Sequence, residues 1–128
     1  MPSDHRDLAL IVARYHGMVH RAFALRPATI LEFMERADAF RRPERFAQAL
    51  IACEADSRGR TGLEADPYPQ RGYLHAARDA AASIKPSPLE ISVQSGEMIA
   101  EHVHRRRVES IAAVRAQFAH ITPAGPTR

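Results

Sequence analysis

The sequence predicts an all-α protein of about five helices in an irregular bundle. Apolar residues recur at three- and four-residue intervals over successive stretches of the chain, which is the period of amphipathic helices. Prolines stand where one such stretch gives way to the next. Aromatic residues make up only 6% of the chain and tryptophan is absent, while alanine is abundant, which favours helices that approach one another closely.

The composition is that of one ordinary domain. The 128 residues suggest a single domain with a modest core, and the net charge of +3 suits a polyanionic partner without requiring one. The single cysteine, Cys53, excludes an internal disulfide, suits a reducing compartment and is expected in the core. No window is long and apolar enough to span a bilayer, and the first residues lack secretory character. We therefore expect a soluble cytoplasmic protein that has no membrane partner.

The first helix is expected to end before Pro27 and to be capped at its start by Ser3 or Asp4. Its apolar face is formed by residues at helical spacing, namely Leu8, Ile11, Val12, Tyr15, Met18, Val19, Ala22 and Phe23. This stripe needs a partner surface to cover it.

Two further helices are each expected to begin at a proline, because proline suits the first helical position. The second begins at Pro27 and the third at Pro43. The inward positions of these two helices are Ile30, Phe33, Met34, Ala37 and Phe40, followed by Phe46, Ala49, Leu50 and Cys53. A break from Glu54 to about Gly72 is expected to follow.

A fourth helix is predicted from about Tyr73 to Ile84, where the prolines of "KPSP" end it. The stretch "LEISVQ" alternates weakly and is compatible with a short extended piece. The last helix is expected after Ser95, which is a good cap. Its apolar stripe comprises Ile99, Val103, Val108, Ile111, Val114 and Phe118.

The segment "EADSRGRTGLE", Glu54 to Glu64, combines groups that bind phosphate. Hydroxyl and guanidinium groups donate to phosphate oxygens, and glycines let the backbone approach a ligand closely. The candidate phosphate-binding residues are Ser57, Arg58, Gly59, Arg60, Thr61 and Gly62. The alternative is that Glu54, Asp56 and Glu64 pair with these arginines and organise the bend. The chemistry of the segment leaves both interpretations open.

Two other features are weaker candidates for a functional site. His16 and His20 stand at i and i+4 on the first helix, so both can face one metal ion if His5 or His75 supplies a third ligand. No glutamate follows His16, so this is not the zinc-protease pattern, and ordinary surface or half-buried histidines are the alternative.

The basic run "HVHRRRVES" lies on the last helix. Three consecutive arginines point in different directions around a helix and cannot form one patch. Arg105 and Arg106 can follow phosphates if they are exposed, and a solvated face is the alternative.

The segment "CEADSRGRTGLE", Cys53 to Glu64, resembles a segment of the bacterial multifunctional CCA proteins, which are class II tRNA nucleotidyltransferases that carry an HD domain. "RDLALIVARYHGMVH" resembles the late helix of that HD region. "FMERADAFRRPERF" and "DPYPQ" resemble the flanks of the acidic-Arg-Gly motif, and "SGEMIAEHVHRRRVESIAAV" resembles the C-terminal helix of the family. The resemblance covers nearly the whole chain, in order and at compatible spacing.

The resemblance implies the C-terminal part of such an enzyme. Residues 1–25 correspond to the terminal helix of a truncated HD region, and residues 26–128 to a C-terminal helical tRNA-binding domain, together one compact unit. In the family, the catalytic head with its Mg²⁺ and the metal motif of the HD region lie upstream of this part. We therefore expect no cofactor and no catalysis in this chain alone.

The resemblance also implies the partners. The C-terminal part is expected to hold tRNA, with Arg58 and Arg60 on the RNA backbone, and to contact the head and HD portion. One alternative is a structural remnant that self-associates through the uncovered first helix. Another is a metal-dependent phosphohydrolase remnant that uses His16 and His20. Gly17 speaks against it, because some relatives have an acid at that position.

Overall fold

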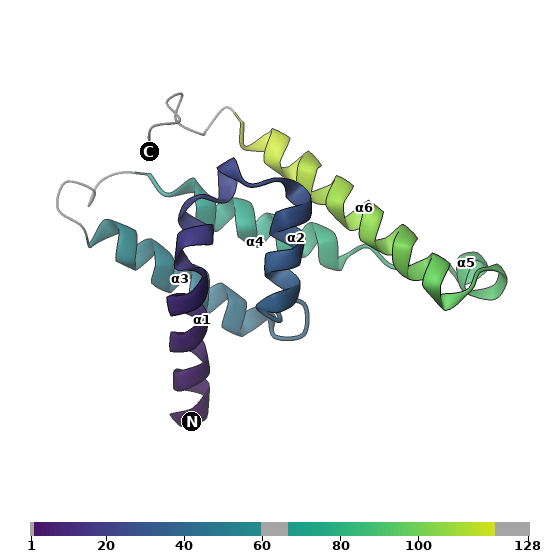
Figure 1. The fold of residues 1–128 in the computed structure, drawn as a ribbon. Coiled ribbons are helices and arrows are strands. Elements are labelled where there is room, and N and C mark those ends of the chain that lie inside the picture. Colours follow the sequence, from purple (N-terminus) through teal and green to yellow (C-terminus); the bar gives the residue numbers. More distant parts are fainter. Residues whose placement is uncertain (1, 60–66, 120–128) are drawn as a thin grey trace.

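The helices expected from the sequence are present in the computed structural model, which describes residues 2–59 and 67–119, with side chains from residue 6 onward. Within these ranges all regular structure is helical, so the all-α prediction is confirmed. The elements in chain order are α1 (Pro2–His20), the 3-10 helix η1 (Ala22–Ala24), α2 (Pro27–Arg36), α3 (Pro43–Arg58), α4 (Pro69–Ala82), α5 (Pro88–Val93) and α6 (Gly96–Gln117). Figure 1 shows α6 running alongside α4, with α1, α2 and α3 grouped beside them.

Proline determines where most of these helices begin. Pro27 and Pro43 occupy the first position of α2 and α3, as predicted. Pro69 does the same for α4, so the predicted start of this helix near Tyr73 is wrong by about one turn. The last predicted start is confirmed, because the Ser95 hydroxyl accepts from the Met98 amide at the beginning of α6.

The stretch "LEISVQ" is helical up to Val93, so its interpretation as an extended piece is wrong. Ser87 precedes α5, and its hydroxyl accepts from the Glu90 amide at 3.1 Å. The Glu90 carboxylate in turn accepts from the Ser87 amide at 3.0 Å. This reciprocal capping box stabilises a single short turn of helix that weak alternation could not predict.

The first and third helices differ from expectation at their ends. Because α1 begins at Pro2, Ser3 and Asp4 lie within its first turn and not before it, so the predicted start of this helix is wrong by a few residues. The helix ends at His20, and the residues before Pro27 form η1 and an extended link, since a residue that precedes proline avoids helical geometry. The third helix continues through Ser57 and Arg58, which are helical and not part of a loop.

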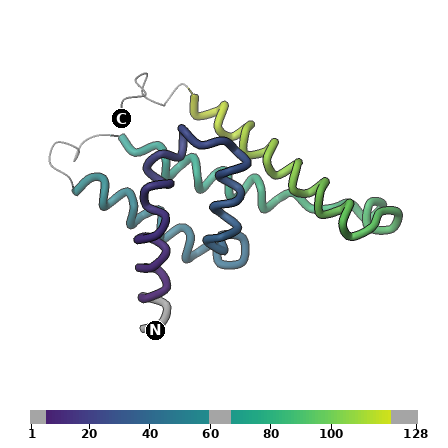
Figure 2. The backbone as a smooth tube through the Cα atoms, in the orientation of Figure 1, coloured from purple at the N-terminus to yellow at the C-terminus, as the bar shows by residue number. Residues whose placement is uncertain are grey.

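One apolar core joins the helices. Its buried side chains come from every helix except α5 and from the turn that follows α2, and they are Tyr15, Val19, Ala22, Ile30, Leu31, Phe33, Met34, Ala37, Ala39, Phe46, Leu50, Cys53, Tyr73, Leu74, Ala77, Ala81, Ile111 and Val114. The fully buried alanines of α4, Ala77 and Ala81, allow α6 to pack closely along it, which agrees with the alanine-rich composition (Figure 2).

The helix α1 is part of this core. Tyr15 and Val19 are buried, and the Tyr15 ring lies 5.2 Å from the Phe33 ring of α2. Toward the N-terminus the helix extends past its neighbours, and Leu10 is 60% exposed there. The core therefore includes residues on both sides of the predicted boundary between residues 25 and 26, which stays a prediction. Among the described residues, no helix is both long and apolar enough to cross a membrane.

Replacing Gly17 by alanine is expected to stabilise the fold. A Cβ atom at Gly17 would meet nothing within 4 Å, and the helix interior favours alanine over glycine by about 1 kcal/mol. We expect Gly17→Ala to raise the free energy of unfolding by about 1 kcal/mol, measured by urea denaturation. Gly59→Ala is the control, because its Cβ would lie 3.3 Å from the Ala55 carbonyl oxygen. An equal or lower stability of Gly17→Ala would contradict the packing of α1.

Candidate nucleic-acid interface

Two arginines share one carboxylate where α3 ends and α4 begins. The Nε of Arg58, in the last turn of α3, donates to Glu54 Oε2 at 2.8 Å. The Nη1 of Arg71, in the first turn of α4, donates to Glu54 Oε1 at 2.9 Å. We call these three residues the arginine cluster. Arg58 is therefore paired with an acid of its own segment, as the structural interpretation of this stretch expected.

The charge of the cluster is positive. The hydrogen bond from Arg71 is the largest influence on Glu54 and, with that from Arg58, holds its pKa below the ordinary value of 4.5, against a smaller opposing effect of burial. Glu54 thus remains a carboxylate at neutral pH, and two guanidinium groups outnumber it. Both guanidinium side chains stay accessible, with Arg58 41% and Arg71 49% exposed.

Beside the cluster, His20 connects the end of α1 to α3 and to the start of α4. Its Nδ1 lies 2.7 Å from the Tyr68 hydroxyl, and its Nε2 lies 3.1 Å from Asp56 Oδ2. In neutral His20 the proton belongs on Nε2, because the Asp56 carboxylate can only accept. Burial raises the pKa of Tyr68, so its hydroxyl remains a donor to Nδ1. The Gln70 amide also donates to the His20 carbonyl at 3.0 Å.

The other predicted phosphate-binding residues of this segment are only partly described. Ser57 is half-buried on the last turn of α3. Gly59 follows that helix with a φ of −74°, so it does not use the left-handed conformation that glycine permits. Arg60, Thr61 and Gly62 lie outside the described residues.

The three consecutive arginines of α6, which are Arg105, Arg106 and Arg107, diverge as predicted for neighbouring helical positions. Arg106 donates through Nη2 to Glu90 of α5. Arg107 donates to the Ala81 carbonyl at the end of α4 at 3.0 Å, and its guanidinium lies 4.8 Å from the centre of the Phe40 ring. Arg105 is exposed. Only Arg105 and Arg106 are therefore placed to meet a ligand.

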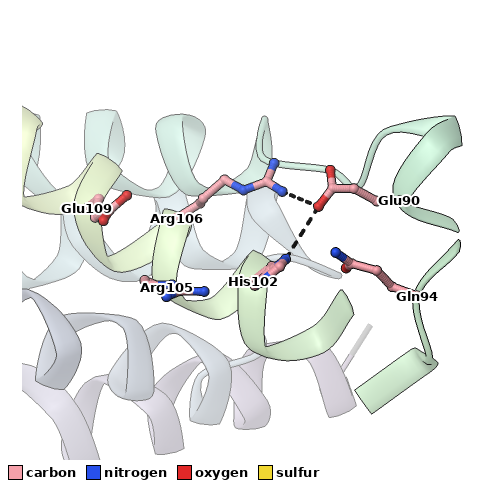
Figure 3. Close-up of a pocket in the computed structure, with 6 residues that line it drawn as sticks. All are labelled: Glu90, Gln94, His102, Arg105, Arg106 and Glu109. Atoms are coloured by element: carbon pink, nitrogen blue, oxygen red, sulfur yellow. Dashed lines mark hydrogen bonds and ion pairs between the residues drawn. The ribbon is translucent and has the colours of Figure 1, made fainter. Parts of the chain in front are cut away.

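Arg105 and Arg106 line an open pocket of about 470 Å³ between α5 and α6 (Figure 3). The residues that line it are Glu90, Gln94, His102, Arg105, Arg106 and Glu109. His102 Nδ1 lies 3.6 Å from the same Glu90 oxygen that Arg106 contacts. The hydrogen bond from Arg106, helped by the Ser87 amide, lowers the pKa of Glu90 to about 2. In this pocket two carboxylates lie beside two arginines, whereas in the arginine cluster two guanidinium groups outnumber one carboxylate.

Acid is expected to weaken the attachment of α5. Because the pKa of Glu90 falls from 4.5 to about 2 on folding, the unfolded chain binds protons first, and stability present above pH 4.5 is lost as the pH falls towards 2. We expect Glu90→Gln to reduce this loss when urea denaturation is measured across that range. Glu44→Gln, on the exposed first turn of α3, is the control. Identical pH profiles for Glu90→Gln and the unmodified chain would contradict the ion pair.

The described members of the two groups of predicted RNA-binding residues are not brought together. Figure 1 shows the C-terminal end of α3 at the left of the molecule and α5 with the start of α6 at the right. The end of α3 carries Ser57 and Arg58, whereas α6 carries Arg105 and Arg106 near α5. A ligand that contacts both groups must therefore be long.

The predicted metal pair is adjacent but engaged elsewhere. The rings of His16 and His20 lie 5.9 Å apart, and His16 Nδ1 is 3.0 Å from the Val12 carbonyl oxygen. Both ring nitrogens of His20 are already bonded. His75 pairs with Asp79 at 3.5 Å on α4. In the part of the chain that the structure describes, no three His, Cys, Asp or Glu side chains form a group that could hold a metal ion.

Sequence patterns give little indication that Arg71, Tyr68 and Glu90 belong to a site. Arg71 lies 17 positions from the carboxylate that it contacts, and Tyr68 lies 48 positions from His20. Only Glu90 had an available signal, the Ser-x-x-Glu spacing from Ser87 that is typical of a capping box.

Several curated proteins similar to this chain share one name. A Multifunctional CCA protein of Thioalkalivibrio sulfidiphilus is 49% identical over 118 residues, which cover 92% of this chain and 29% of that protein. Proteins of the same name from Nitrosococcus oceani and Cupriavidus pinatubonensis are 51% and 48% identical, and the matches cover 87% and 93% of this chain.

This chain spans only 27% to 29% of the length of these relatives. No protein-family profile matches it. No solved structure matches it either. The resemblance read from the sequence is thus confirmed by long matches at about half identity.

Proposed function

Because this chain is homologous to a part of the bacterial multifunctional CCA proteins, we propose that it is the C-terminal, tRNA-binding part of a CCA-adding tRNA nucleotidyltransferase and has no catalysis of its own. The observation that carries the proposal is the match over about nine-tenths of this chain. In this proposal the protein works in the cytoplasm, where tRNA 3′ ends are matured and repaired. The head and HD portion supply the chemistry.

The arginine cluster supports the tRNA part of the proposal. An enzyme that must accept every tRNA needs contacts to features that all tRNAs share, and phosphate contacts position RNA without reading its sequence. Arg58 presents a guanidinium that Glu54 holds in place at 2.8 Å and that remains accessible. Arg105 and Arg106, on the far side of the molecule, suit a second contact with a long polyanion.

We assign no metal-dependent step to this chain. The Mg²⁺ of nucleotidyl transfer and the divalent metal of the HD motif belong, in this proposal, to the portions of the enzyme that the match does not cover. The engagement of both ring nitrogens of His20 agrees with this assignment.

The proposal predicts salt-sensitive binding of tRNA. We expect Arg58→Ala combined with Arg60→Ala to weaken the affinity about tenfold and to reduce the salt slope by about 2, because two phosphate contacts are lost. Fluorescent tRNA titrated at two salt concentrations measures both quantities. The matched control is Arg36→Ala with Arg41→Ala, which removes two exposed arginines that also pair with acids of their own segments. No binding by the unmodified chain, or an equal loss in the control, would contradict the proposal.

Self-association is the second candidate function. Large apolar side chains are exposed around α5 and the start of α6, namely Leu89, Ile91, Val93 and Met98. Leu10 on α1, the helix expected to mediate association, is exposed as well. Sedimentation equilibrium over a wide concentration range tests this candidate. An increase in mass that Leu10→Ser abolishes would assign it to α1, and a constant monomer mass would exclude it.

A further inference from the structure

We propose that Arg71 and Arg58 together form a site for a single phosphate group, and that the backbone of a bound RNA supplies this phosphate. The site assigns a role to Arg71, which lies on α4, whereas Arg58 lies on α3. The identity of the RNA as tRNA rests on the proposed function, whereas the recognition of phosphate rests on the geometry.

The geometry brings two guanidinium groups to one point. Arg58 ends α3 and Arg71 begins α4, and Glu54 accepts from both at 2.8 Å and 2.9 Å, one carboxylate oxygen for each. Since a single carboxylate spans the gap between the arginines, they are close enough to contact one small anion. A phosphate presents a pair of oxygens at nearly the spacing of a carboxylate, and guanidinium groups bind both anions through parallel N–H bonds.

Arg71 retains donors for such a ligand. Only its Nη1 is bonded to Glu54, and no other hydrogen bond joins Arg71 to the described residues. About half of its side chain is exposed. A guanidinium carries N–H groups on three nitrogens, so the remaining edge can meet a phosphate without breaking the bond to Glu54.

The charges around the cluster favour an anion. Two guanidinium groups face one carboxylate in the cluster, and the first turn of α4, which carries Arg71, contains no acid. Another carboxylate of the described residues, Asp56, accepts from His20 at 3.1 Å. The positive end of the α4 dipole adds to the attraction without being a site by itself.

The phosphate site is tested first without RNA. Inorganic phosphate is titrated into the ¹⁵N-labelled chain at constant ionic strength, with chloride as the balancing anion, and the arginine Nε–H signals are followed by NMR. We expect saturable shifts of the Arg71 and Arg58 signals. We also expect a weaker Arg58 shift in Arg71→Lys, because lysine keeps the positive charge but lacks the paired N–H donors of a guanidinium. Arg36 is the internal control, because it pairs with the single acid Glu32 at 3.2 Å. Shifts of Arg71 that do not saturate, or that match those of Arg36, would overturn the site.

The source of the phosphate is tested with tRNA. We expect Arg71→Ala to weaken tRNA binding five- to tenfold and to lower the salt slope by about 1, while Arg36→Ala changes neither. Circular dichroism of both variants checks folding, and Arg71→Lys is expected to fall between Arg71→Ala and the unmodified chain. A saturable phosphate shift with unchanged tRNA binding by Arg71→Ala would overturn RNA as the source. Failure of the unmodified chain to bind tRNA would overturn the proposed function and the assignment of RNA as the source. The phosphate titration would still show whether Arg71 and Arg58 bind a phosphate group.

Discussion

Replacing Tyr73 by alanine is expected to lower the free energy of unfolding by about 3–5 kcal/mol, as for other large aromatic side chains removed from a core. Tyr73 lies on α4 and is fully buried. Its ring stacks on Phe23 at 4.7 Å between centroids and lies 6.0 Å from the Phe118 ring. Removing it would leave a cavity between η1, α4 and the end of α6, since close-packed neighbours relax only partly.

Tyr73→Phe separates the ring from the hydroxyl. The Tyr73 hydroxyl is buried and finds no hydrogen-bond partner among the described residues. Burial also raises the pKa of Tyr73, so the group stays a neutral phenol. We expect Tyr73→Phe to be as stable as the unmodified chain or more stable by up to about 1 kcal/mol, because a buried unpaired polar group is removed. Urea denaturation measures both variants. A large loss in Tyr73→Phe would show that the hydroxyl is bonded.

Cys53 is expected to react with iodoacetamide at least about 100-fold more slowly in the folded chain than in the urea-unfolded chain. Burial, with a smaller effect of the Asp56 charge, raises the pKa of Cys53 from 9.0 to about 11. Near pH 8 this higher pKa reduces the fraction of reactive thiolate about 100-fold. The side chain is also almost completely buried, which slows the reaction further.

The rate at which Cys53 is alkylated measures how well α3 is packed beneath the arginine cluster. Cys53 precedes Glu54 on α3 and faces the core. Mass spectrometry of alkylated chains over time gives the rate, and Leu10→Ser, a substitution at an exposed position of α1, serves as the control that leaves it unchanged. A folded chain that reacts within about tenfold of the unfolded rate would contradict the burial of this face of α3.

Much of the fold could be predicted because its causes are local. Proline at the first helical position determines the starts of α2 and α3, and the Ser95 hydroxyl determines the start of α6. Helical spacing identified the buried face of α3, including Cys53. Where local signals compete, the prediction was wrong: "LEISVQ" alternates like a strand, but its capping box makes it helical.

The site was less predictable from the sequence. Ser57 and Arg58 were singled out by their chemistry, but their helical placement follows from the continuation of α3, which packs against α1 and α4. The direction of each α6 arginine depends on what lies opposite it, with Glu90 meeting Arg106 and the end of α4 meeting Arg107. Spacing along one helix shows that such side chains diverge but not which partner each one meets.

The amino-acid sequence alone was enough to establish the helical class, the starts of α2, α3 and α6, and the inward faces, because these depend on residues within a few positions of one another. It also established the resemblance to multifunctional CCA proteins, which rests on the order and spacing of segments along nearly the whole chain. Only the tertiary structure decided that Arg71 joins Arg58 on Glu54, and that His20 meets both Tyr68 and Asp56. These contacts join different helices, so they exist only once α1, α3 and α4 have packed at their particular angles. The geometry of packing is a property of the whole core, whereas the helical pattern is a property of each segment.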